Sequence, residues 1–167
     1  YMNNLNIFFI FLILLLIILS KKSKKENFEN RISISIFSLF KNNEKYLPYY
    51  FKMMKLFEKK YDMYYYFYEN DSTDNTKELI YDFMKNRKGN FVSESLKGKL
   101  NKEILNSSKG IKETRGIKMA YIRNLNKKSA GENNTDYSIV IDSEVYFKSN
   151  IIDKMIQCQK NTNIGMV

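Results

Sequence analysis

Hydrophobic and polar positions repeat along the chain with two different periods, which predict strands and helices in turn. Residues 31–39 alternate at period two and predict a first strand. Apolar residues then recur at spacings of three and four within residues 45–61, which predicts a helix with Pro48 in its first turn. Residues 62–68 are apolar on both faces, as expected for a buried parallel strand. This part of the chain therefore begins as a strand–helix–strand unit.

The alternation of strand and helix continues through the rest of the chain. Helices are predicted at 77–86, 117–128 and 150–159, and strands at 90–95 and 137–141. Strands that alternate with helices of this length indicate βαβ units, whose parallel sheet is covered on both faces. We therefore predict an α/β fold with three αβα layers and a mostly parallel, Rossmann-like sheet.

The N-terminal segment departs from this pattern. Residues 7–19 are an unbroken apolar run, and four lysines follow almost at once. With its flanking residues the run is close to the length of about 17–25 residues that a membrane-spanning helix needs. A cleaved signal peptide is the alternative, although neither a basic leader nor a small-residue cleavage site accompanies the run. The predicted organisation is a membrane anchor helix at 1–20, a polar stem at 21–30 and one domain at 31–167.

Composition restricts the chemistry. The chain has 28 Lys and Arg against 18 Asp and Glu, a single cysteine and no histidine. One cysteine excludes an internal disulfide framework, and the lack of histidine disfavours a zinc site. The basic balance is typical of proteins with polyanionic partners, so a non-catalytic protein that binds nucleic acid or an anionic membrane is an alternative function. The basic stretch at 97–118 fits that alternative but has no aromatic stacking residues and no nucleic-acid-binding signature.

Acidic residues follow two of the predicted strands at the point where each ends. The triplet Glu69-Asn70-Asp71 follows the second strand, and Asp142-Ser143-Glu144 follows the fourth. Because the carboxyl ends of parallel strands meet at one edge of a sheet, we expect both triplets at that edge. Carboxylates without histidine suit magnesium or manganese, whose coordination is completed by water and substrate phosphates. Lys41 and Arg123 would add positive charge for those phosphates.

Four sequence blocks resemble, in the same order, those of family-2-like glycosyltransferases with the GT-A fold. They lie at residues 42–47, 69–76, 120–124 and 141–145, and the resemblance covers nearly all of the chain after the stem. The second block is also similar to that of fungal-type mannosyltransferases of the same fold. The resemblance implies the nucleotide-binding half of a GT-A domain. It further implies transfer of a sugar from a UDP- or GDP-sugar to a glycan, protein or lipid acceptor, without a nucleic-acid partner.

The resemblance implies roles for residues that would bind the nucleotide sugar. Lys41 and Asn42 would line the nucleoside pocket, and Glu69 would contact the base or the ribose. Asp71 is assigned to the same nucleotide-sugar site. Arg123 would face the donor.

The resemblance also implies a metal. Asp142 would bind the ribose or the metal, and Glu144 would be the metal ligand of a DxD-like motif in which Asp is usual. Manganese or magnesium is therefore the expected cofactor.

No catalytic base is assigned, because the sequence ends before the region in which the family keeps it, and we expect an incomplete domain that could be inactive by itself. The implied location is a single-pass membrane anchor, of the ER or Golgi type in a eukaryote, with the side of the membrane left open.

Overall fold

The computed structural model describes residues 10, 12–17, 31–96, 115–132 and 134–162. The chain divides into two units, Tyr1–Ile32 and Ser33–Val167. The predicted anchor and stem lie almost wholly outside the described residues, apart from a short helical segment at 12–17. Among the described residues, none of the helices combines the length and the apolar character that crossing a membrane requires.

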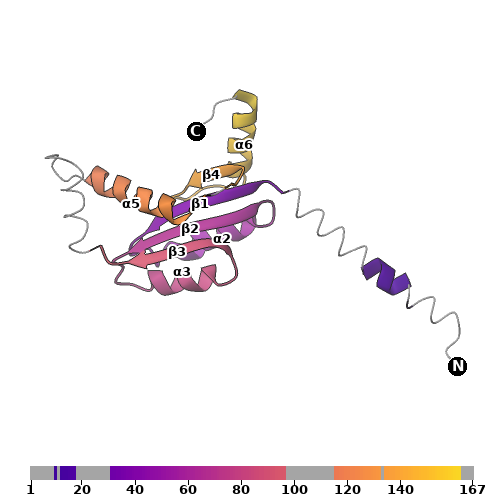
Figure 1. Cartoon of the computed structure of the whole chain (residues 1–167), viewed down its shortest axis with the longest axis horizontal. Helices are drawn as coiled ribbons and strands as arrows, with labels where there is room; N and C mark the ends of the chain where they lie inside the picture. The colour runs from indigo at the N-terminus through magenta and orange to yellow at the C-terminus, as the bar shows by residue number, and fades with distance from the viewer. Residues whose placement is uncertain (1–9, 11, 18–30, 97–114, 133, 163–167) are drawn as a thin grey trace. The chain divides into compact units, whose positions relative to one another are not determined.

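The second unit contains a four-stranded sheet in which every pairing is parallel (Figure 1). Its strands are β1 (Ser33–Phe40), β2 (Asp62–Asn70), β3 (Lys88–Glu94) and β4 (Tyr137–Val140). The order across the sheet is β3-β2-β1-β4, so the direction of winding reverses between β1 and β4. In Rossmann-like sheets, ligands bind outside the carboxyl ends of the strands at such a reversal. The predicted α/β class and parallel sheet are confirmed.

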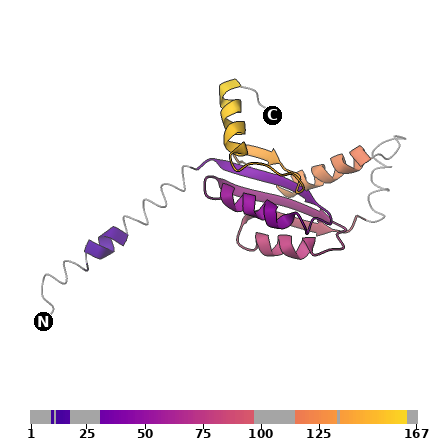
Figure 2. The same cartoon turned by 180° about the vertical axis from the view of Figure 1, so that it is seen from behind.

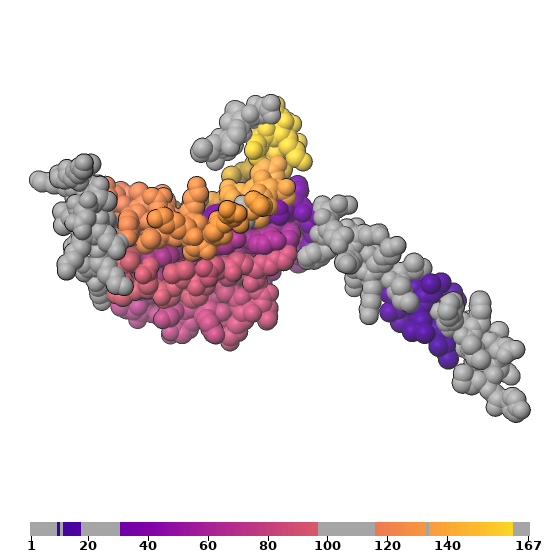
Figure 3. Space-filling view, in the orientation of Figure 1, coloured from indigo at the N-terminus to yellow at the C-terminus, as the bar shows by residue number. Residues whose placement is uncertain are grey.

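Helices cover both faces of the sheet (Figures 1 and 2). Neighbouring residues of a strand point to opposite faces. Leu39 of β1 packs with Ile122 and Leu125 on one face, whereas the ring of Phe40 lies 5.6 Å from that of Tyr50 on the other. β4 extends the sheet beside β1, and the space-filling view shows β4 and the helix before it in orange (Figure 3). The helices are α2 (Leu47–Phe57) and α3 (Thr76–Met84) on one face, α5 (Arg115–Ser129) on the other, and α6 (Ile151–Thr162) after β4.

The predicted elements differ from the observed ones mainly at their ends. Pro48 lies in the first turn of α2, as predicted. The strand β2 is buried on both faces and continues past the predicted end at Tyr68 through Glu69 and Asn70. The ladder explains this extension, because Glu69 pairs with Ser93 of β3. Glu69 therefore belongs to the strand and not to the loop after it.

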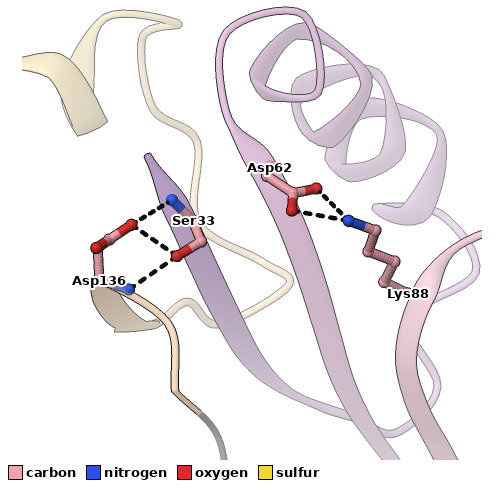
Figure 4. A network of polar contacts seen from close by, with 4 residues as sticks. All are labelled: Ser33, Asp62, Lys88 and Asp136. Carbon is pink, nitrogen blue, oxygen red and sulfur yellow. Dashed lines mark hydrogen bonds and ion pairs between the residues drawn. The ribbon is translucent and has the colours of Figure 1, made fainter. Parts of the chain in front are cut away.

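Two polar pairs fasten the amino-terminal edge of the sheet (Figure 4). The backbone N–H and the hydroxyl of Ser33 both donate to Oδ2 of Asp136 at 2.7 Å. The ammonium of Lys88 lies 2.7 Å from each carboxylate oxygen of Asp62. Hydrogen bonds from Ser33 lower the pKa of Asp136, and the hydrogen bond to Asp62 raises the pKa of Lys88. Each pair joins residues at the starts of neighbouring strands, so it helps to fix their register.

Candidate functional site

The loops that follow β1 and β2 are joined to each other at the carboxyl edge of the sheet. The backbone N–H of Asn42 donates to the hydroxyl of Ser72 at 3.1 Å, and Oδ1 of Asn42 accepts from the N–H of Thr73 at 2.7 Å. Nearby, the N–H of Glu44 donates to Oδ2 of Asp74 at 3.1 Å. The side chain of Asn42, predicted to line a nucleoside pocket, thus holds the neighbouring loop in place.

The chain leaves both β1 and β2 through a residue with a left-handed backbone conformation. Asn42 and Asp71 each have φ 52°, and each follows the last residue of its strand within two positions. Asn and Asp tolerate this conformation better than other residues with a Cβ. Residues held in such conformations cluster at functional sites, where the surrounding contacts over-determine the backbone. The two loops therefore leave the sheet edge in a fixed and similar way.

The backbone N–H groups of the first loop are already used. Those of Lys41, Asn42, Asn43 and Glu44 donate to side chains at 2.7–3.1 Å. A loop that cradles phosphate needs consecutive N–H groups that point at the ligand. Negative charge on a ligand at this edge would therefore be met by cationic side chains or by a metal, and not by this loop's backbone.

The side chain of Asn43 connects the loop after β1 to the turn after β4. Nδ2 of Asn43 donates to Oε1 of Glu144 at 3.2 Å. Asn43 is only 3% exposed, its Oδ1 accepts from the N–H of Lys41, and its own N–H donates to the hydroxyl of Thr76. The amide is thus fixed from several directions and orients the exposed carboxylate of Glu144. Asn43 was not among the predicted site residues, although it lies in the first of the four blocks.

The acidic triplet after β4 forms a turn. The carbonyl of Asp142 accepts from the N–H of Val145 at 3.1 Å, and Ser143 between the two acids is buried. The carboxylate of Asp142 lies 3.6 Å from the guanidinium of Arg123 in α5, so these two predicted site residues do come together. Glu144, in contrast, meets a residue that precedes α2. One partner therefore belongs to α5 and the other to the loop between β1 and α2.

Glu69 is turned into the protein at the end of β2. It is 3% exposed, its Oε1 accepts from the N–H of Ser72 at 2.8 Å, and its Oε2 accepts from the hydroxyl of Ser93 at 2.5 Å. Both carboxylate oxygens thus already have partners. The described contacts of Glu69 hold the turn between β2 and α3, while its predicted contact with a base or ribose stays a prediction.

Asp71 follows Glu69 by two residues, and its side chain is more exposed to solvent than that of Glu69. It accepts hydrogen bonds from the hydroxyl of Ser95 at 2.7 Å and from the N–H of Leu96 at 3.2 Å. Partial burial acts to raise the pKa of Asp71, but these bonds, a bond from Asn70 and the charge of Lys41 outweigh it, so the pKa lies below its ordinary value. The charge of Lys41 is thus one of several influences on the pKa of Asp71, and the assignment of both residues to a nucleotide-sugar site stays a prediction.

The acidic turn fits a divalent cation if a phosphorylated ligand completes the coordination. Asp142 and Glu144 supply two carboxylates, and within the part of the chain that the structure describes no group of three or more His, Cys, Asp or Glu could hold a metal. Magnesium is commonly held by one or two carboxylates together with water and substrate phosphates. Asp142 contacts Arg123 through one of its carboxylate oxygens, and Glu144 likewise contacts Asn43 through one oxygen. The donor set is therefore suited to a metal that arrives with its substrate.

Comparison with protein-family models, with curated proteins and with solved structures found no match. The chemistry of the edge follows from its own residues. Lys41 and Arg123 are cations that can meet phosphate, and Asp142 and Glu144 are exposed oxygen ligands. Asp71 can accept from hydroxyl groups. Together these groups suit a ligand that carries both phosphates and hydroxyls.

Proposed function

We propose that the chain is the nucleotide-sugar-binding part of a metal-dependent glycosyltransferase. The observation that carries this proposal is the meeting of four sequence blocks at one sheet edge. The loops after β1 and β2 are hydrogen-bonded to each other, the first loop is bonded to the turn after β4, and that turn is paired with α5. The parallel topology brings these turns to one edge, and the hydrogen bonds and the ion pair join them there.

The donor would lie along the edge from β3 toward β4. The nucleoside half comprises Lys41, Asn42, Glu69 and Asp71. Of its two acids, Asp71 is the better acceptor for a ribose hydroxyl, because Glu69 is buried whereas Asp71 is partly exposed. Glu69 and Asn42 hold the loops that present the other groups.

The diphosphate half lies at the reversal between β1 and β4, where ligands bind in sheets of this kind. Asp142 and Glu144 would hold manganese or magnesium there. The bound cation would supply Lewis acidity for the negative charge that develops on a departing nucleoside diphosphate. Arg123 adds a second positive charge beside Asp142, and Asn43 keeps the Glu144 carboxylate in place. The proposal includes a membrane anchor at 1–20 and a glycan, protein or lipid as the sugar acceptor.

A calorimetric titration tests the proposal. UDP-glucose and GDP-mannose are added to the full chain with and without manganese, and we expect one of them to bind only with the metal. Glu144→Gln and Asp142→Asn should each weaken that binding by at least about 10-fold. Asp82→Asn is the matched control, because Asp82 is an exposed acid paired with Lys85 on α3, and its binding should equal that of the unaltered chain.

Two results would count against this account, and they differ in meaning. If the Glu144→Gln and Asp142→Asn variants bind the nucleotide sugar as tightly as the unaltered chain, the proposed metal site is wrong, but the protein still binds nucleotide sugars. Failure to bind either nucleotide sugar, together with salt-sensitive binding of nucleic acid, would favour the alternative of a non-catalytic basic protein.

A further inference from the structure

An exposed aromatic ring lies beside the acidic turn. Tyr146 follows Glu144 by two residues and is 65% exposed. Its ring centroid lies 4.7 Å from that of Tyr49 in α2, and the hydroxyl of Tyr49 donates to the carbonyl of Phe147 at 2.7 Å. The ring of Tyr146 is therefore supported by a second, fixed ring while most of its surface stays open to solvent.

An acid of the same turn accompanies this ring. Glu144 precedes Tyr146 by two residues, and its carboxylate accepts a hydrogen bond from the amide of Asn43 at 3.2 Å. A hydrogen-bond acceptor thus accompanies an open aromatic surface.

A pyranose ring is complementary to such a surface. One face of a pyranose consists of C–H groups, which pack well on the electron-rich face of an aromatic ring. Its rim consists of hydroxyls, which can donate to a carboxylate. Small-ligand sites generally combine an aromatic wall with a few placed polar groups in this manner.

We propose that Tyr146, beside Glu144 of the acidic turn, forms a subsite that stacks a pyranose ring of the substrate. A nucleobase would also stack on an aromatic ring, but position favours the sugar. The proposed nucleoside half lies in the loops after β1 and β2, whereas Tyr146 follows β4, on the other side of β1. The inference rests on the proposed function. The pyranose belongs either to the donor or to an acceptor glycan, and the experiment separates the two.

Tyr81 provides a matched control. It is 61% exposed, the ammonium of Lys85 lies 5.5 Å from its ring centre, and Lys85 pairs with Asp82 at 2.7 Å. Tyr81 thus shares its residue type and its high exposure with Tyr146. It differs in lying on α3 instead of beside the acidic turn. An effect of exposure alone would appear equally at the two tyrosines.

Saturation-transfer difference NMR on the full chain tests the subsite. The probes are UDP-glucose, UDP as the nucleotide control, and methyl α-D-mannopyranoside and methyl β-D-glucopyranoside as free sugars. Diamagnetic magnesium replaces manganese in all samples. Tyr146→Ala should reduce transfer to the pyranose C–H protons by about 5-fold or more. Tyr146→Phe should keep the transfer, and Tyr81→Ala should leave it unchanged. The uracil and ribose signals of UDP should not respond to Tyr146→Ala.

The pattern of signals decides each question separately. Dependence on Tyr146 for the glucose of UDP-glucose alone assigns the ring to the donor, and dependence for the free glycosides assigns it to an acceptor. Pyranose signals that need Tyr146 while UDP gives none would support the subsite and contradict the proposed function. UDP signals accompanied by pyranose signals that ignore Tyr146→Ala, or the absence of pyranose signals from all probes, would overturn the subsite.

Discussion

The two edges of the sheet contain similar residues that are arranged in different ways. At the amino edge, Asp62 pairs with Lys88 at 2.7 Å, and a second acid caps the start of β1 (Figure 4). At the carboxyl edge, Asp142 and Arg123 lie 3.6 Å apart and both are about half exposed. Two residues there also adopt left-handed backbone conformations. The charged groups of the amino edge are therefore paired closely with each other, whereas Asp142 and Arg123 of the carboxyl edge are paired more loosely.

This difference shows that charge alone does not define a site in this protein. With a formal net charge of +10, acids and lysines occur close together in many places. The carboxyl edge is distinguished by a buried framework that holds exposed groups. Asn43 and Glu69 are each 3% exposed, and they fix the positions of Glu144 and of the turn after β2. A buried support beneath an exposed acid is therefore the feature that separates a candidate site from a structural pair.

The largest expected effect concerns the amino edge, at Gly89 of β3. This residue has φ +119°, and a Cβ added to it would lie 1.9 Å from the backbone oxygen of Tyr65. Gly89→Ala should lower the free energy of unfolding by about 2–4 kcal/mol, because β3 would have to move away from β2. Gly131→Ala is the control, since φ is +60° there but nothing lies within 4 Å, and about 1–2 kcal/mol is expected. Equal losses in urea unfolding would show that the close approach of β3 to β2 is unimportant.

A smaller effect is expected from the buried acid of the carboxyl edge. Glu69→Ala removes the acceptor for the N–H of Ser72 and the hydroxyl of Ser93, so stability should fall by about 1–3 kcal/mol. Glu144→Gln, at an exposed position, should leave stability unchanged while it weakens nucleotide-sugar binding. Urea unfolding of both variants checks whether Glu69 stabilises the fold while Glu144 does not. A Glu69→Ala variant as stable as the unaltered chain would contradict it.

The smallest effect is a pH dependence at the amino edge. The pKa of Asp136 is lowered in the folded protein, so its contribution to stability is complete above the unfolded value of about 3.9 and is lost as pH falls through the folded pKa. At neutral pH the thermal midpoint of Asp136→Asn should lie slightly below that of the unaltered chain. The gap should close as the pH is lowered stepwise toward 2. A gap independent of pH would mean that the charge of Asp136 has no part in the pairing.

Much of the fold follows from local patterns in the sequence. The period-three-and-four spacing and Pro48 predicted α2, and the continuous apolar run predicted a buried β2. The parallel topology then placed the strand ends at one edge, where Arg123 and Asp142 lie 3.6 Å apart. These predictions depended on periodicity and on the geometry of βαβ units, and both are encoded within short stretches.

The remaining details depend on partners far apart in the sequence. Asn43 and Glu144 are separated by 101 positions, so nothing near either residue shows that one holds the other. The side chain of Asn42 is engaged by Thr73, 31 positions away, and local sequence does not distinguish this structural role from ligand binding. Glu69 appeared to be a loop residue because acids are uncommon in buried strands, yet its pairing with Ser93 keeps it in the ladder.

Paramagnetic broadening by manganese tests most directly the central claim that ligand binding is confined to the carboxyl edge. The eight residues of β1 separate the two edges by about 25 Å. Manganese is added with UDP-glucose or GDP-mannose to the full chain labelled with ¹⁵N. We predict that the amide signals of Asn43 and Glu144 disappear while those of Ser33, Asp62 and Lys88 remain. Broadening centred on the amino edge, or none at either edge, would contradict the account.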